Sequence, residues 1–449
     1  MSTHRRINQI QRILRKRELI YFGPRGIDAS PLTCFDSLGA VFSLIAPIES
    51  GVAETCLESA TGVRMDLNRG TLDDNPSTLA VRFREALFAR LSRPNAVIPY
   101  SPVRTLSHGW LMAKDTSLPL GLFHEQQSCF DHKPWVEQEL GKCGLATIPW
   151  EYVGTLESSR VFDLLDQGAP FVVRMPQSRG GSSIWLIRNR DDMDDIFELE
   201  PREGLFCLAP YFESATSVNI NACVFRGGEV SVHPSSVQLV GVDVCTSRTL
   251  GYAGNDFASI SEISKKALKC LDSMTHSIGA WLANRGYRGA FGFDALVLGD
   301  RVMFVELNPR FQASSATACQ LDRTIERTDQ YVNHISAFLE LGAPDRLSLL
   351  ELVREQEPLS HIVVYNKRSE AVALHQRPKL GTKSSIQLLP APGIVVEYQG
   401  ILASILWKGG VSRNGRDFDE DAGSAVLELL QGFSPVGAEK DIKQTTISS

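Results

Sequence analysis

Apolar residues recur at two different spacings along the chain, and together these spacings predict a mixed α/β protein. A short amphipathic helix with a basic face is predicted over 4–17, where apolar residues lie at helical spacing among arginines: Ile7, Ile10, Ile13 and Leu14. Apolar runs at 19–26, 40–47 and 95–102 then predict three strands of an N-terminal α/β domain.

The pattern changes from about residue 120. A helix is predicted over 131–144, and two apolar strands within 171–187 flank a loop rich in glycine and serine. A long helix over 261–285 precedes a strand pair at 289–311, and a helical run follows at 323–341. Short β-branched runs from residue 358 onward predict a small β-rich domain. Four units are predicted: an N-terminal α/β domain with its basic helix (1–115), a central domain (116–342), a C-terminal domain (343–435) and a tail (436–449).

Composition narrows the class of protein. The 449 residues are 43% hydrophobic with a formal net charge of −6, so the sequence offers no broad basic surface for nucleic acid. Nine scattered cysteines form no Cys-x-x-Cys pair, which argues against a zinc cluster or a disulfide framework and favours a reducing compartment. The N-terminus lacks the apolar core of a secretory signal, and no apolar stretch approaches the ~20 residues of a membrane span. We therefore predict a cytoplasmic protein with neither a nucleic-acid nor a membrane partner.

The segment 289–311 carries the strongest chemical signal. It is predicted to form a β-hairpin with the three-residue loop 299–301, which places Asp294 directly opposite Glu306. Two facing carboxylates in an otherwise apolar strand pair repel each other unless one is protonated or a cation lies between them. A two-residue turn would instead place Val305 opposite Asp294, and the two acids would then be unrelated surface residues.

The spacing after this acid pair points to a metal site. Side chains alternate along a strand, so Glu306, Asn308 and Arg310 can point the same way. Two carboxylates and an amide oxygen are hard ligands that suit Mg²⁺, which shares its remaining positions with phosphate oxygens. A nearby arginine can neutralise charge that develops on a transferring phosphoryl group. The predicted metal ligands are thus Asp294, Glu306 and Asn308, and Arg310 is the predicted catalytic residue.

The glycine-rich loop 177–183 is a candidate phosphate-binding element. Glycine lets backbone amides approach phosphates closely, and the candidate loop residues are Ser178, Gly180, Gly181 and Ser182. The loop has neither the P-loop pattern nor the G-x-G-x-x-G of dinucleotide folds, and an ordinary flexible hairpin is the alternative. Lys133 and Arg174 are placed where they could reach phosphate oxygens. Tyr211 and Phe212 end an apolar run that suits one wall of an adenine pocket, although such a run is also typical of core.

The order of these features along the chain resembles that of the ATP-grasp superfamily of carboxylate–amine and carboxylate–thiol ligases. The resemblance covers roughly residues 120–320, and the whole chain if 19–102 is the domain that precedes ATP-grasp in this family. It implies an ATP-grasp fold with an N-terminal pre-ATP-grasp α/β domain and a small β-rich C-terminal domain. It also implies ATP and Mg²⁺ as cofactors, with Mn²⁺ as a substitute.

The resemblance assigns a role to each candidate residue. Nucleotide phosphates are expected to contact Lys133 and Arg174, although the family usually has lysine at the second position. Tyr211 and Phe212 are expected to flank adenine, and Gln238 matches the polar residue on a neighbouring strand. Asp294, Glu306 and Asn308 match the family's magnesium ligands, and Arg310 matches the arginine that steadies an acyl phosphate.

The implied activity is ADP-forming ligation of a carboxylate to an amine. The carboxylate attacks the γ-phosphate of ATP, and the amine then attacks the acyl phosphate. Small carboxylates and amines such as amino acids are the expected substrates, as in peptide-bond formation in specialised metabolism. Two alternatives stay open: a carrier-protein or coenzyme thiol as the acceptor, with the basic helix as its landing site, and a catalytically silent nucleotide-binding regulatory protein. A homodimer is a further open expectation.

Overall fold

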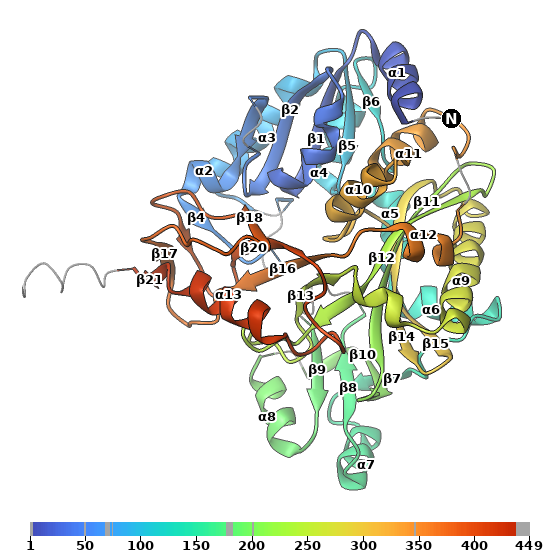
Figure 1. The fold of residues 1–449 in the computed structure, drawn as a ribbon, viewed down its shortest axis with the longest axis vertical. Helices are drawn as coiled ribbons and strands as arrows, with labels where there is room; N and C mark the ends of the chain where they lie inside the picture. Colours follow the sequence, from blue (N-terminus) through green and yellow to red (C-terminus); the bar gives the residue numbers. More distant parts are fainter. Residues whose placement is uncertain are drawn as a thin grey trace, which may run out of the picture.

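The computed structural model describes residues 3–48, 51–67, 72–73, 75–176, 183–199, 202–344 and 347–436. Within these ranges the strands form an N-terminal sheet, a projecting four-stranded sheet, a central eight-stranded sheet and a small four-stranded sheet (Figure 1). In the same ranges, no helix combines the length and the apolar content needed to cross a bilayer.

The N-terminal domain is a parallel sheet covered on both faces. Its helices on one face pack against Phe22 and Phe42, while α1 covers the other face near Tyr21. The predicted basic helix and the three predicted strands are confirmed. The sheet order is β3 (Ala53–Cys56), β2 (Leu38–Ile45), β1 (Glu18–Arg25), β5 (Asn95–Pro99) and β6 (Ser117–Pro119), with α1 (Thr3–Leu14), α2 (Leu57–Thr61), α3 (Thr78–Leu91) and α4 (Arg104–Met112).

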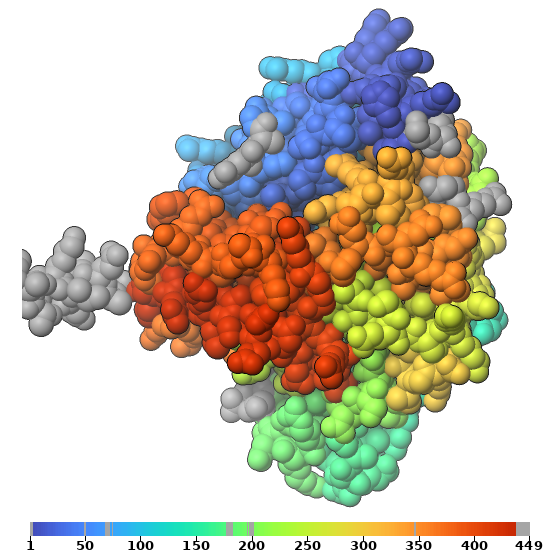
Figure 2. All heavy atoms as spheres, in the orientation of Figure 1, coloured from blue at the N-terminus to red at the C-terminus, as the bar shows by residue number. Residues whose placement is uncertain are grey.

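A small lobe projects from the rest of the molecule (Figures 1 and 2). It joins a four-stranded antiparallel sheet to two helices around a compact apolar cluster that includes Phe171 and Phe206. The predicted strand–loop–strand arrangement is confirmed, because the two strands that flank the glycine loop pair directly. The sheet order is β7 (Glu151–Thr155), β10 (Glu203–Pro210), β8 (Phe171–Arg174) and β9 (Ile184–Ile187), with α7 (Ser159–Gln167) and α8 (Arg190–Leu199).

The central sheet separates an apolar face from a polar one. On strand β11, Val218 and Ile220 pack beneath α9, whereas Asn219 between them points to the opposite face. This alternation follows the two-residue period of a strand. The sheet order is β15 (Arg301–Asn308), β14 (Gly289–Leu298), β11 (Thr216–Val224), β12 (Val230–Val240), β13 (Tyr252–Asp256), β16 (Leu359–Tyr365), β20 (Ile401–Lys408) and β18 (Ser384–Leu388), with α9 (Lys265–Ala283) and α12 (Leu349–Glu355) on the apolar face.

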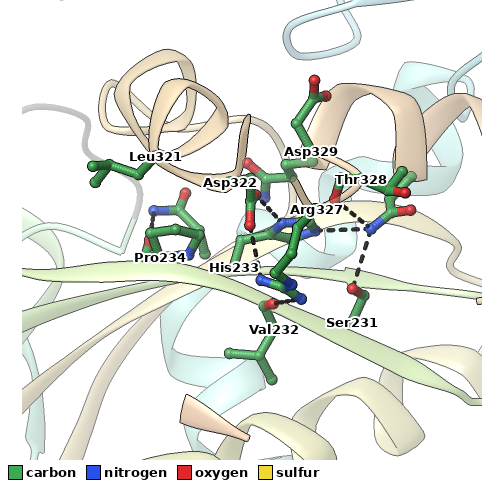
Figure 3. A network of polar contacts seen from close by, with 12 residues as sticks. Ser231, Val232, His233, Pro234, Leu321, Asp322, Arg327, Thr328 and Asp329 are labelled. Carbon is green, nitrogen blue, oxygen red and sulfur yellow. Dashed lines mark hydrogen bonds and ion pairs between the residues drawn. The ribbon is translucent and has the colours of Figure 1, made fainter. Parts of the chain in front are cut away.

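Two further helices are fixed to this sheet by a buried polar network (Figure 3). His233 of β12 has its Nδ1 2.6 Å from an oxygen of Asp322, and Arg327 donates to the other oxygen of that carboxylate at 2.8 Å. The predicted helical run at 323–341 is in fact the end of α10 (Ser315–Thr324) and all of α11 (Gln330–Phe338). The second helix begins separately because the side chain of Asp329 caps it, accepting from the Val332 amide at 3.0 Å.

The C-terminal segment shares sheets with earlier parts of the chain. Arg64 from the N-terminal region is fully buried, pairs with Glu58 at 2.6 Å and donates to the Ile401 carbonyl at 3.1 Å. The two regions are therefore held together by a hydrogen bond from this buried, charge-paired arginine as well as by strand pairing. The small sheet has the order β21 (Phe433–Pro435), β17 (Val372–Leu374), β19 (Val395–Val396) and β4 (Val63–Arg64).

The remaining described helices are α5 (His124–Gln127), α6 (Lys133–Lys142) and α13 (Glu420–Leu430). Short 3₁₀ turns lie at Gly26–Cys34, Ser128–Asp131 and Ser259–Glu262.

Candidate functional site

The predicted acid pair exists, although the predicted hairpin loop was wrong. Leu298 pairs with Arg301, so two residues close the turn rather than three. Gly299 adopts a φ of +60°, which suits the first position of a tight two-residue turn. With that turn alone, Val305 would lie opposite Asp294.

A β-bulge restores the acid pair. The register runs evenly as far as Ala295 opposite Phe304 and then shifts, so that Asp294 pairs with Glu306 and Val305 is the extra residue. A bulge bends its strand and re-aims the side chains that follow it. Glu306 and Asn308 consequently face the same cavity as Asp294.

Amide side chains hold Asp294 in place. Asn219 donates to one oxygen of Asp294 at 2.6 Å, and Gln238 lies 3.5 Å from the other. Asn219 also donates to Gln312 at 2.7 Å, which fixes its own orientation. Burial, with the facing Glu306 carboxylate adding to it, raises the pKa of Asp294 to about 7. Asp294 therefore changes its protonation near neutral pH, and a cation bound between the two acids would favour its charged form.

Lys133 neutralises the second acid. Its Nζ lies 2.8 Å from an oxygen of Glu306, and the lysine is buried at the first turn of α6. Burial raises the pKa of Glu306, but Lys133 and the two nearby arginines outweigh it, so the pKa of this carboxyl lies below its usual range. The backbone amide of Lys133 donates to the Pro176 carbonyl at 3.3 Å, which joins α6 to the strand that leads into the glycine loop.

Arg174 supports the bulge as well as facing the cavity. Its side chain is 1% exposed and forms an ion pair with Glu137, while its guanidinium stacks 3.7 Å from the centre of the Trp150 ring. Its Nη1 donates to the carbonyl of the bulge residue Val305 at 3.3 Å. A planar fork can make these contacts together, which a lysine at this position cannot do. The arginine at this position thus has a structural reason.

Asn308 and Arg310 lie together at the end of β15. Arg310 donates to the Asn308 side-chain oxygen at 2.9 Å and to the Phe311 carbonyl at 3.0 Å. Its Nε has no partner among the described residues, although it is buried. The arginine is therefore oriented toward the cavity by its neighbours while part of its hydrogen-bonding capacity is unused.

One cavity of about 1000 Å³ collects the predicted residues that the structure describes. It lies among the N-terminal domain, the projecting lobe and the polar face of the central sheet, and its lining includes Lys133, Arg174, Tyr211, Phe212, Gln238, Asp294, Glu306, Asn308 and Arg310. The loop predictions fall outside the described residues: Ser178, Gly180, Gly181 and Ser182. Their role stays a prediction.

Several lining residues carried no recognisable signal in the sequence. Arg416, from the C-terminal segment, lies 5.4 Å from the centre of the Tyr211 ring, and Asp417 lines the same cavity. Trp150 and Arg25 also line it. These residues come from distant parts of the chain. Asn219, which also lines the cavity, has a local signal that the sequence analysis did not use, because it is an amide in an apolar strand.

Comparisons with known proteins give a fold but no sequence family. No protein-family profile matches the chain, and no curated protein sequence matches it. Among solved structures, a biotin carboxylase–β-γ-ATP complex from Campylobacter jejuni is 14% identical, with 96% of this chain and 89% of that chain covered and a TM-score of 0.57. The biotin carboxylase domain dimer of 2-oxoglutarate carboxylase from Hydrogenobacter thermophilus, in complex with MgADP, ADP and bicarbonate, is also 14% identical, with 88% and 86% covered and a TM-score of 0.60. Carboxyaminoimidazole ribonucleotide synthase from Aspergillus clavatus, complexed with ATP, is 13% identical, with 93% and 98% covered and a TM-score of 0.58.

These likenesses extend over nearly the whole chain. At this level of identity they concern the arrangement of the backbone, and the chain has the ATP-grasp fold. The predicted fold class is confirmed.

Proposed function

We propose that this protein is a Mg²⁺- and ATP-dependent, ADP-forming ligase that activates a carboxylate as an acyl phosphate and couples it to an amine. The observation that carries the proposal is the bulged hairpin, which holds Asp294 opposite Glu306 at the wall of a large cavity. Lys133 and Arg310 line the same cavity and supply positive charge beside the two acids. The ATP-grasp fold of the chain supports the same class of reaction.

The residues present fit a divalent cation. Two carboxylates and the Asn308 amide oxygen are hard donors, and a cation between Asp294 and Glu306 would replace the proton that their repulsion retains. The described residues contain no group of three or more His, Cys, Asp or Glu side chains that could enclose a metal, so coordination positions would be left for phosphate oxygens. When bound, Mg²⁺ would neutralise phosphate charge. The complexes of the Hydrogenobacter domain with MgADP and of the Aspergillus enzyme with ATP support this choice.

The nucleotide is proposed to lie between the lobe and the central sheet. Tyr211 and Phe212 line the cavity where the lobe meets it, which suits an adenine wall. Lys133 lines the same cavity in contact with Glu306. Arg174 faces the cavity with both of its terminal nitrogens already in hydrogen bonds, so we assign it a supporting contact to phosphate rather than the main one.

The chain's own residues have distinct parts in the proposed reaction. Arg310, held by the Asn308 oxygen, would orient the substrate carboxylate and balance the charge of the acyl phosphate. Lys133 would hold phosphate oxygens in line with that carboxylate. Bound nucleotide and substrates would restrict water in the cavity, and water otherwise hydrolyses an acyl phosphate.

The test is release of ADP and phosphate from MgATP with pairs of amino acids, followed by mass detection of the product. We expect product and ADP in equal amounts, and loss of turnover in Glu306→Gln with the fold intact. Glu262→Gln, on the exposed 3₁₀ turn, is the matched control and should retain full activity. Product that forms only after a carrier protein or coenzyme is added would favour the thiol acceptor. MgATP binding without turnover for any acid–acceptor combination would favour the silent regulatory protein.

A further inference from the structure

Arg25 is a buried cation at the part of the cavity that the N-terminal domain forms. It ends strand β1, is 8% exposed and lines the cavity with its side chain. Its Nε donates to Asp28 at 2.8 Å, and Asp28 is itself buried. One side of the guanidinium is therefore fixed by an acid beneath it, which holds the side chain in a single orientation.

The other side of this guanidinium is unused. Its two terminal nitrogens have no hydrogen-bond acceptor in the part of the chain that the structure describes, and neither belongs to the fully buried polar atoms without a partner. They therefore have access to the cavity. A buried cation with free donors that point into a cavity is costly unless an anion binds there.

Three tyrosines lie near Arg25 in the cavity lining. Tyr100, Tyr252 and Tyr365 line the cavity, and each lies close enough to Arg25 for an electrostatic interaction. Tyr252 also interacts electrostatically with Asp294, so this tyrosine lies near both Arg25 and the acid pair. A ligand on Arg25 would thus lie beside the proposed metal site rather than at a remote position.

An apolar surface adjoins the tyrosines. Leu44, Leu67 and Ile401 pack with Tyr252 and Tyr365 in one cluster, and all of them line the cavity. The other arginine near Tyr365, Arg248, pairs with Asp66 at 2.9 Å. The local chemistry is accordingly one available guanidinium, phenol groups and aliphatic side chains.

We propose that Arg25 binds the free carboxylate of an amino-acid substrate whose apolar side chain packs against the neighbouring tyrosines and aliphatic residues. This inference rests on the proposed ligase function and names the class of one of its substrates. One guanidinium fork matches the two oxygens of a carboxylate, and the carboxylate that Arg25 holds is distinct from the one that is activated. It stays unmodified through the reaction, so Arg25 is a specificity-determining residue.

The experiment compares free amino acids with their carboxamides. Leucine, isoleucine, valine, methionine, phenylalanine, tyrosine and tryptophan, each as free acid and as carboxamide, are titrated calorimetrically into the full chain with and without MgADP. We expect at least one free acid to bind and its carboxamide to bind about 10- to 100-fold more weakly, the loss expected for a charge-assisted hydrogen-bond pair. No binding by any free acid, or equal binding of acid and amide, would overturn the proposal.

Variants separate a binding role from a structural one. Arg25→Gln leaves Asp28 buried without its partner, so the double variant R25Q/D28N removes both charges together. We expect the double variant to lose the preference for the free acid, Arg25→Lys to retain part of it, and Arg12→Gln, on the exposed face of α1, to match the wild type. An unchanged preference in R25Q/D28N would contradict the proposal.

Binding of MgADP distinguishes this inference from the proposed function. All of the variants should bind MgADP as the wild type does, because none of them changes a residue predicted to contact the nucleotide or the metal. This binding also reports that the variants are folded. If the wild type does not bind MgADP, the proposed function fails, while the amino-acid titration still decides the role of Arg25. Fragmentation of the ligated product then shows which of the two joined amino acids keeps its free carboxylate.

Discussion

His334 links the N-terminal domain to the hairpin of β14 and β15 and should make the stability of the protein sensitive to acid. Its Nδ1 accepts from the Ala290 amide at 2.9 Å, and its Nε2 lies 2.7 Å from the Leu120 carbonyl, so the neutral ring both accepts and donates. Burial lowers the pKa of His334 to about 4, from an ordinary value of 6.5. Between about pH 6.5 and pH 4, His334 therefore stays neutral in the folded protein but is protonated in the unfolded chain.

The sign and size of the effect follow from this difference. Above about pH 6.5 neither state is protonated; as the pH falls toward 4, only the unfolded state gains the proton, so folding loses free energy. The full shift in the pKa of His334 corresponds to about 3 kcal/mol of unfolding free energy. Between pH 7.5 and pH 5, about 2 kcal/mol of that unfolding free energy is lost. His361, whose pKa burial lowers to about 3, should add a loss of similar size in the same range.

Urea unfolding of the wild type and His334→Gln at pH 7.5 and pH 5.0 isolates the contribution of His334. Glutamine can keep one acceptor and one donor but does not titrate. The loss of unfolding free energy on acidification should be about 2 kcal/mol smaller in the variant, since His361 and the carboxylates contribute equally to both proteins. His276→Gln, at an exposed position, is the control and should behave as the wild type. Equal acid losses in His334→Gln and the wild type would refute the reasoning.

Three further predictions concern the cavity and its support. Lys133→Met should weaken MgATP binding by about 10-fold or more, because it removes the cation that contacts Glu306. Unchanged affinity in calorimetric titration would show that Lys133 does not bind the nucleotide. Arg174→Lys should lower the free energy of unfolding by about 1–3 kcal/mol, since an ammonium cannot reach both the buried acid and the bulge carbonyl; an unchanged urea midpoint would contradict this. Asp322→Asn weakens the pairing of His233 beneath α10 and should cost about 2–4 kcal/mol in the same assay, whereas wild-type stability would show that the network is dispensable.

The hairpin shows what the sequence could and could not predict. The apolar runs predicted both strands, and the assumed three-residue loop predicted the pairing of Asp294 with Glu306, which the structure has. The predicted three-residue loop was nevertheless wrong, because the turn closes after two residues and the bulge at Val305 makes up the difference. Bulges depend on contacts from elsewhere in the chain, here the bond from Arg174, and no local pattern encodes such a contact.

Residues brought in by tertiary structure were the ones that sequence reasoning missed. Arg25 and Arg416 belong to loops or strand ends that look like ordinary surface in the sequence, yet both line the cavity. Their positions depend on how the N-terminal domain and the C-terminal segment pack around the central sheet (Figure 2). By contrast, Lys133 and Glu306 could be predicted because each lies beside a local signal, a helix start and a strand pattern.

The most direct test of the account is the dependence of ADP binding on Mg²⁺ in the wild type and in Glu306→Gln. Calorimetric titration of ADP, with and without Mg²⁺, should show that the ion tightens binding to the wild type by about 10-fold or more. In Glu306→Gln that gain should disappear, while ADP alone should bind both proteins with similar affinity. An equal gain from Mg²⁺ in the variant would contradict the claim that the paired acids of the bulged hairpin hold the metal.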